Sequence, residues 1–303
     1  MHLPAHPVDK RAEEEYNIEK FPAKESIMAK LHFLKSVTDT INTSFILEGE
    51  ACLLAVDGGF ATETPYLYEY ITGLGGHITA WFITHFHDDH VGALITLLRE
   101  HPDVKVDGIY ACLPSDEFLY THAPDGDTSA VRDMLEGLRE IMAERGIPFV
   151  TVQAGDVYAF DGGRIRVPIL RTPDESITQN PINNSSIVFR FEADGKSILF
   201  LGDLGEEGGD QLMEAHPEGL HADFLQMAHH GQNGVSRECY EAIRPTYCLW
   251  PTPSWLWDNL GPKGYDTGIF NTVVTRGWIS ALKCVKRHYL MIHGTQVIDL
   301  LEV

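Results

Sequence analysis

The sequence predicts an α/β protein in which two β-sheets pack together with helices on the outside. Two observations support this fold class. Helical segments lie between groups of short strand-like segments, and many of these strands are apolar throughout, as buried strands are. Hydrophobic residues make up 44% and charged residues 22% of the 303 residues, as in an ordinary globular protein. We expect one domain over residues 28–303 and a charged, proline-punctuated extension over residues 1–27.

In the first half of the chain, apolar runs bounded by turn residues predict strands. These strands cover residues 27–34, 44–47, 52–56, 78–83 and 108–113. Thr64 as an N-cap, with Pro65 at the first helical position and glycines from residue 73 on, predicts the first helix. A second helix is expected over residues 91–99. Apolar residues recur every three or four positions over residues 129–145, which predicts the longest helix.

The second half is predicted to be mainly strands. They cover residues 149–153, 157–160, 165–170, 186–192, 196–201, 224–228 and 247–250. Asp194-Gly195 forms a hairpin turn between two of them. Ser236 is expected to cap a short helix that ends at residue 243, and residues 272–282 are predicted to form the last helix.

Charge and cysteine usage exclude several classes of protein. The formal net charge is −21, so the chain lacks the basic face that binds a long nucleic acid. No apolar run approaches the ~18 residues of a membrane helix, and the first residues have no secretory h-region. The five cysteines never form C-x-x-C, which favours reduced thiols in the cytosol over a disulfide framework. We therefore expect a cytoplasmic protein with a small-molecule substrate; the sequence does not specify its oligomeric state.

The segment from His85 to His90 carries the strongest chemical signal. It reads H-F-H-D-D-H, so His85, His87, Asp89 and His90 supply imidazole and carboxylate groups at the end of a predicted strand. Such ligands suit zinc, with manganese and iron as the other candidates. H-x-H-x-D-H arises by chance in roughly 0.2% of chains of this size and composition. The segment therefore predicts a metal site.

Two later strands end in further candidate ligands. Asp203 follows the strand over residues 196–201, and His229 and His230 follow the strand over residues 224–228. Strand ends are where open sheets commonly build their sites. Together with the first motif, these residues would complete two metal positions that share Asp203.

These motifs, with the V-D-G-G turn before them, resemble those of the metallo-β-lactamase-fold hydrolases over about residues 28–300. The resemblance implies a four-layer αββα sandwich with two divalent metal ions. It implies that His85 and His87 bind the first ion, that Asp89, His90 and one of His229 or His230 bind the second, and that Asp203 bridges. We favour His229 as the ligand because it directly ends the strand. Asp57 matches an early aspartate of the family that supports the site without ligating.

One departure from the family pattern concerns a third histidine for the first metal. Residues 172–186 contain no histidine and end in P-I-N-N-S-S. This pattern is similar to that of the hydrolase domain of bacterial DNA-uptake channel proteins and of phosphorylcholine esterases, which implies a phosphodiester substrate. Asn183 or Asn184 would then ligate weakly, orient water or bind a substrate oxygen, or would only form an Asx turn. Ser185 and Ser186 have no neighbouring base in sequence and are expected to be loop hydroxyls.

The expected function is hydrolysis of a small phosphodiester by a water that two metal ions activate. Asp89 or Asp203 would take the proton of this water, and His230 would donate a proton to the phosphate or the leaving group. A lactone, thioester or other acyl substrate is the alternative, since the same water serves both reactions. A non-catalytic relative that binds a metal or another ligand is the alternative from another class, and an iron oxidoreductase is a fourth.

Overall fold

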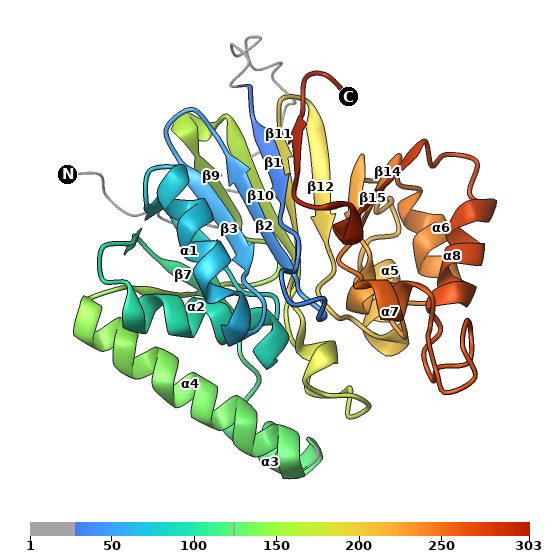
Figure 1. Cartoon of the computed structure of the whole chain (residues 1–303), viewed down its shortest axis with the longest axis horizontal. Coiled ribbons are helices and arrows are strands. Elements are labelled where there is room, and N and C mark those ends of the chain that lie inside the picture. The colour runs from blue at the N-terminus through green and yellow to red at the C-terminus, as the bar shows by residue number, and fades with distance from the viewer. Residues whose placement is uncertain (1–27, 124) are drawn as a thin grey trace.

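Two seven-stranded sheets face each other in the computed structural model, which describes residues 28–123 and 125–303 (Figure 1). The first sheet contains, in spatial order, β16 (Gln296–Asp299), β1 (Lys30–Phe33), β2 (Ser44–Glu48), β3 (Leu53–Asp57), β5 (Ala80–Phe82), β7 (Ile109–Ala111) and β8 (Phe149–Thr151). The second contains β15 (Arg287–Leu290), β14 (Tyr247–Trp250), β13 (Phe224–Gln226), β12 (Lys196–Phe200), β11 (Val188–Ala193), β10 (Ile165–Arg171) and β9 (Val157–Phe160). A short pair, β4 (His77–Ile78) and β6 (Lys105–Val106), lies apart from both.

Helices cover the outer face of each sheet. The first sheet is flanked by α1 (Thr64–Gly73), α2 (Asp88–Glu100), α3 (Asp116–His122) and α4 (Asp125–Arg145). The second is flanked by α5 (Glu206–Ala215), α6 (Arg237–Ile243), the short α7 (Ser254–Trp257) and α8 (Thr272–Ala281). None of the described helices combines the length and apolar character that a membrane crossing requires. The layers run helix, sheet, sheet, helix, which confirms the predicted sandwich.

Three apolar clusters separate these four layers. The central cluster joins the inner faces of the two sheets through stacked rings such as Phe82 and Phe189, whose centroids lie 5.0 Å apart. The second cluster joins the first sheet to α1, α2 and α4, and the third joins the second sheet to α5, α6 and α8. Each sheet is therefore buried on both faces, which explains the uniformly apolar strands in the sequence.

Parallel pairing places several strand ends at one edge of the sandwich. In the first sheet, β3 and β5 are parallel, and in the second sheet β12, β13 and β14 are parallel. The carboxyl ends of parallel strands lie at the same edge, where α/β proteins gather their functional side chains. The segments that follow these strands contain every residue that the sequence assigned to a metal site.

Most predicted elements are present with shifted ends. The first helix begins at Thr64, one residue earlier than expected, because a 3-10 turn (Ala61–Glu63) precedes it and makes Glu63 the N-cap. The strand expected over residues 224–228 ends at Gln226, since a second 3-10 segment (Ala228–Gly231) holds the two histidines. Ser236 caps α6 as predicted, accepting a hydrogen bond from the Cys239 amide. The expected extension over residues 1–27 lies outside the described residues.

Candidate metal centre

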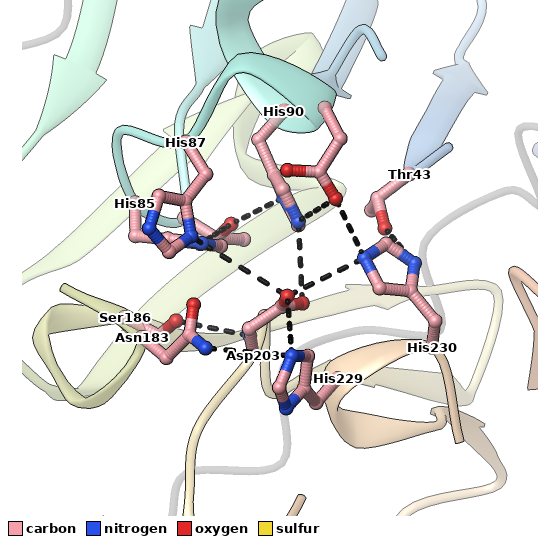
Figure 2. Close-up of polar contacts among 12 residues, drawn as sticks. Thr43, His85, His87, His90, Asn183, Ser186, Asp203, His229 and His230 are labelled. Carbon is pink, nitrogen blue, oxygen red and sulfur yellow. Dashed lines mark hydrogen bonds and ion pairs between the residues drawn. The ribbon is translucent and has the colours of Figure 1, made fainter. Parts of the chain in front are cut away.

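Four buried side chains form a compact cluster at this edge of the sandwich (Figure 2). Asp89 and His90 come from the first turn of α2, while Asp203 and His230 follow β12 and β13. One ligand atom from each lies within 4.8 Å of the others. His230 Nε2 lies 2.9 Å from Asp89 Oδ2 and 3.3 Å from Asp203 Oδ2, so the cluster connects the two sheets.

His85 and His87 lie next to this cluster. They were expected to project to one side of a continuing strand, but β5 ends at Phe82 and an irregular segment carries them. Their rings nevertheless meet, with His85 Nε2 3.0 Å from His87 Nδ1. His85 Nε2 is also 4.0 Å from Asp203 Oδ2. The Asp203 carboxylate thus lies between His85 and the other members of the cluster, His90 and His230, where a bridging group would stand.

The tautomers of three histidines are set by oxygen acceptors. His90 Nδ1 lies 2.7 Å from Asp57 Oδ2, His230 Nδ1 lies 3.0 Å from Pro251 O, and His229 Nδ1 lies 3.2 Å from Asn233 O. Each ring therefore donates through Nδ1 and directs Nε2 toward Asp203. This is the arrangement that prepares a neutral imidazole to bind a metal.

Asp57 is buried, and its side chain forms hydrogen bonds with Thr84 and His90. Its Oδ1 accepts a hydrogen bond from the Thr84 amide (2.8 Å), and its Oδ2 accepts one from the Thr84 hydroxyl (2.7 Å) besides that from His90. The structure thus places Asp57 behind His90, on the side of the ring away from Asp203.

The backbone at the site adopts unusual conformations. Asp57, His229 and His230 all have left-handed φ angles, of 51°, 49° and 54°. Such angles cost about 1–3 kcal/mol each for residues other than glycine, and they recur at functional sites. Gly202, with φ of 57°, precedes Asp203, and a Cβ there would come within 2.6 Å of Ser186 Oγ. This close approach excludes a larger residue.

Burial and charge act in opposite directions at the site. Burial alone would lower the pKa of His90, but the carboxylates of Asp203, Asp89 and Asp57 hold it well above its usual value. Burial would raise the pKa of Asp203, yet His230 and the other imidazoles keep it well below its usual value. Burial and the neighbouring His90 hold the pKa of His85 well below its ordinary value. The cluster therefore favours ionised carboxylates that bind positive charge.

Asn183 and Asn184 have different surroundings. The Asn184 side chain accepts hydrogen bonds from the amides of Gly205 (3.0 Å) and Gly208 (3.3 Å), and it donates one to Gln179 O (2.8 Å). It caps the start of α5, a structural role that the sequence did not distinguish from binding metal or substrate. Asn183 faces the site: its Nδ2 lies 3.4 Å from His229 Nε2, and its buried Oδ1 forms no hydrogen bond.

The two consecutive histidines, of which the sequence analysis favoured His229 as the ligand, differ in their surroundings. His230 is fully buried and belongs to the four-residue cluster. His229 is partly exposed, and its Nε2 lies 3.7 Å from Asp203 Oδ2. The strand stops before both residues, so position along the chain does not decide which ring is inside. The geometry favours His230 as the ligand and leaves His229 at the rim.

Two residues that support the site, Gln226 and Arg171, were not singled out from the sequence, and Ser186 was expected only to be a loop hydroxyl. Gln226 accepts hydrogen bonds from the amides of Leu201 and Gly202 through its side chain, and Ser186 Oγ accepts one from the Asp203 amide. Arg171 Nη1 donates to the carbonyls of Asn184 and Ser186 (2.9 and 3.0 Å). Gln226 and Arg171 are each a polar residue at the last position of a buried strand, and this position could have identified them from the sequence.

The unpaired atoms of the cluster test whether a metal fits. Among the described residues, His90 Nε2 and Asp203 Oδ1 are buried and form no hydrogen bond, although they lie 3.2 Å apart. Buried polar atoms are normally satisfied, so unsatisfied atoms at one point indicate a partner such as an ion. Imidazole and carboxylate are also the donors that zinc and related divalent ions prefer. The residues fit a divalent metal centre.

Comparisons with known proteins agree with this geometry. Residues 37–109 match the model of the metallo-beta-lactamase superfamily. ComE operon protein 3 of Bacillus subtilis is 29% identical over 180 residues, which are 59% of this chain and 20% of that protein. The chain thus spans about a fifth of the length of this relative.

Two solved structures share the fold. The metallo-beta-lactamase fold protein YhfI from Bacillus subtilis has a TM-score of 0.53 at 12% identity, covering 89% of this chain and 99% of its own. CmlA, a diiron beta-hydroxylase from Streptomyces venezuelae, has a TM-score of 0.53 at 13% identity, covering 92% of this chain and 55% of its own. At these identities, the likeness describes the fold alone.

Proposed function

Because the chain contains a metallo-β-lactamase superfamily domain, we propose that it is a hydrolase that uses two divalent metal ions to cleave a small phosphodiester. The observation that carries the proposal is the buried Asp203 carboxylate, which lies within 4.0 Å of four imidazoles supplied by two other segments of the chain. A site so rich in carboxylate and imidazole suits hydrolysis assisted by two cations.

In this proposal, Asp89, His90, Asp203 and His230 hold one ion, and His85, His87 and Asp203 hold the other. When bound, the ions supply a hydroxide from water near neutral pH and neutralise the charge that develops on the phosphoryl oxygens. Zinc is the first candidate for both positions, with manganese and iron as alternatives.

The remaining steps belong to side chains of the chain itself. Asp57 and Pro251 O keep the rings of His90 and His230 oriented through their Nδ1 atoms. Asp89 Oδ2 or an oxygen of Asp203 takes the proton of the attacking water. His229 keeps its Nδ1–H on Asn233 O and presents an unprotonated Nε2 at the rim, 3.7 Å from Asp203 Oδ2. This Nε2 would take up the proton that Asp203 receives from the water and pass it to the leaving oxygen.

Asn183 occupies the region in which many relatives carry a third histidine. Its unpaired Oδ1 and its Nδ2 provide one acceptor and one donor beside His229. We assign it to binding the attacking water or a non-bridging phosphoryl oxygen. The net charge of −21 favours a small substrate over a long nucleic acid.

Two adjacent carboxylates offer a matched test. Asp89 is buried in the cluster, whereas Asp88 is exposed at the same helix start. We expect Asp89→Asn to lower the metal content from near two equivalents and to reduce bis-p-nitrophenyl phosphate turnover at least a hundredfold. Asp88→Asn should keep both. If the protein hydrolyses lactones or thioesters but no phosphodiester, an acyl substrate takes the place of the phosphodiester in the proposal. If the wild-type protein binds zinc or manganese but turns over none of these substrates, a non-catalytic metal-binding protein is favoured.

A further inference from the structure

A pocket of about 220 Å³ is lined by chain neighbours of the residues at the metal centre, including Asn233, which forms a hydrogen bond with His229. Asn184, next to Asn183 in the chain, and Gly205, two residues after Asp203, belong to one wall. Asn233, whose carbonyl accepts the hydrogen bond from His229 Nδ1, belongs to another. A substrate whose phosphate lies at Asp203 would therefore have space for one of its ester groups here.

The lining of the pocket is unusual in its chemistry. It contains six carboxamide side chains, those of Gln179, Asn180, Asn184, Gln232, Asn233 and Asn271. It also contains the carboxylates of Glu206 and Glu207 and the ring of Trp278, and none of the lining residues within 28–123 and 125–303 is a lysine, arginine or histidine. Carboxamides both donate and accept hydrogen bonds, so they match hydroxyl and amide groups. Phosphate groups, by contrast, are usually bound by arginine, lysine or free backbone amides.

The start of α5 also lines this pocket, and a helix N-terminus ordinarily attracts anions. Here that attraction is already met within the chain. Asn184 Oδ1 accepts hydrogen bonds from the amides of Gly205 and Gly208, and Glu206 and Glu207 place two negative charges in the first turn. A further anion would meet like charge, and the described residues that line the pocket supply no cation to compensate it.

We propose that this pocket binds an uncharged, hydroxyl- or amide-bearing group of the substrate, such as a sugar with its base, and that it discriminates against a second phosphate. The inference rests on the proposed phosphodiesterase activity. It narrows the substrate class from phosphodiesters in general to those with a polar, non-anionic ester group.

Two thymidine esters that differ by one phosphate provide the test. Thymidine 5′-(p-nitrophenyl phosphate) and its 3′-phosphorylated form release the same chromophore. For the metal-loaded full chain, we expect the 3′-phosphate to raise KM at least tenfold while kcat changes little. Glu206 is exposed and forms no hydrogen bond with the described residues of the site. Because Glu206→Lys replaces a negative with a positive charge in the pocket, it should reduce the ratio of the two KM values by about three- to tenfold. Glu214→Lys, at an exposed position on the same helix but outside the pocket, is the control.

The outcomes separate this inference from the proposed function. Equal KM values for the two esters, or discrimination that Glu206→Lys leaves unchanged, would overturn the pocket assignment while hydrolysis itself stands. An equal effect of Glu214→Lys would attribute the discrimination to overall charge and would also overturn the assignment. Absence of p-nitrophenol release from both esters and from bis-p-nitrophenyl phosphate would instead refute the phosphodiesterase activity.

Discussion

The substitution Asp57→Asn changes the carboxylate that orients His90 and leaves the proposed metal ligands themselves unchanged. In the wild-type chain, Asp57 Oδ2 accepts hydrogen bonds from His90 Nδ1 and the Thr84 hydroxyl. Asparagine keeps an acceptor for the Thr84 amide but places an NH₂ group where Oδ2 was. His90 must then accept through Nδ1, which moves its proton to Nε2, the atom that faces Asp203. A protonated Nε2 cannot bind a metal.

The loss of such a supporting carboxylate typically weakens metal binding 10- to 100-fold, or about 1.4 to 2.7 kcal/mol. At a fixed metal concentration well above Kd, the variant loses that much metal-linked stability. For a domain of this size, the melting temperature should fall by about 2 to 5 °C relative to wild type with zinc present. Removal of the metal should abolish the difference, because Nε2–H can then donate to Asp203 Oδ1, 3.2 Å away.

The assay is thermal unfolding with and without EDTA, together with a zinc titration against a chromophoric chelator. Asp88→Asn serves as the control, since it changes a neighbouring exposed carboxylate in the same way. Unchanged zinc affinity in Asp57→Asn would refute the tautomer argument. A variant that is equally destabilised with and without EDTA would show that Asp57 stabilises the fold and not the metal-binding form.

Three further predictions concern residues other than the proposed metal ligands. Asn184→Ala removes the cap of α5 and should lower stability by about 1 to 2 kcal/mol in chemical denaturation; no change would contradict the capping role. Burial lowers the pKa of His32, so the unfolded chain binds its proton more readily, and stability should fall as pH drops below about 6.5; His32→Gln should show a weaker fall between pH 7 and 5. Burial raises the pKa of Cys239 and of Cys248 to about 12, so both thiols should resist Ellman's reagent at pH 8 until the protein unfolds; rapid labelling of either would contradict their burial.

Local sequence signals predicted most of the fold. Apolar runs identified strands because both sheets are buried on two faces, and the Asp194-Gly195 turn fixed one hairpin. The short helix α3 and the helix α5 were not predicted. In α5, two glycines follow two glutamates, and glycine is a poor helix former. Its start is stabilised by Asn184, which precedes it by more than twenty residues, so no local pattern could have indicated it.

The metal site was predicted at the level of residue types and strand ends. The sequence could not decide between His229 and His230, because both follow β13 and the left-handed turn at that point determines which ring is buried. It also could not separate Asn183 from Asn184, since their difference arises from the neighbouring start of α5. Both distinctions depend on contacts between distant segments.

The cluster of Asp89, His90, Asp203 and His230 has a further consequence for how the chain unfolds. His230 and Asp89 are 141 residues apart in sequence, and they follow strands of different sheets. An ion held by both would close a long loop in the same sense as a disulfide, and a cross-link over a loop of about 100 residues restricts the unfolded chain by roughly 4 to 5 kcal/mol. Unlike a disulfide, this cross-link is opened by a chelator and not by a reductant. The two halves of the sandwich are therefore expected to separate faster in a chelating environment, so metal supply would control the lifetime of the folded chain as well as its chemistry.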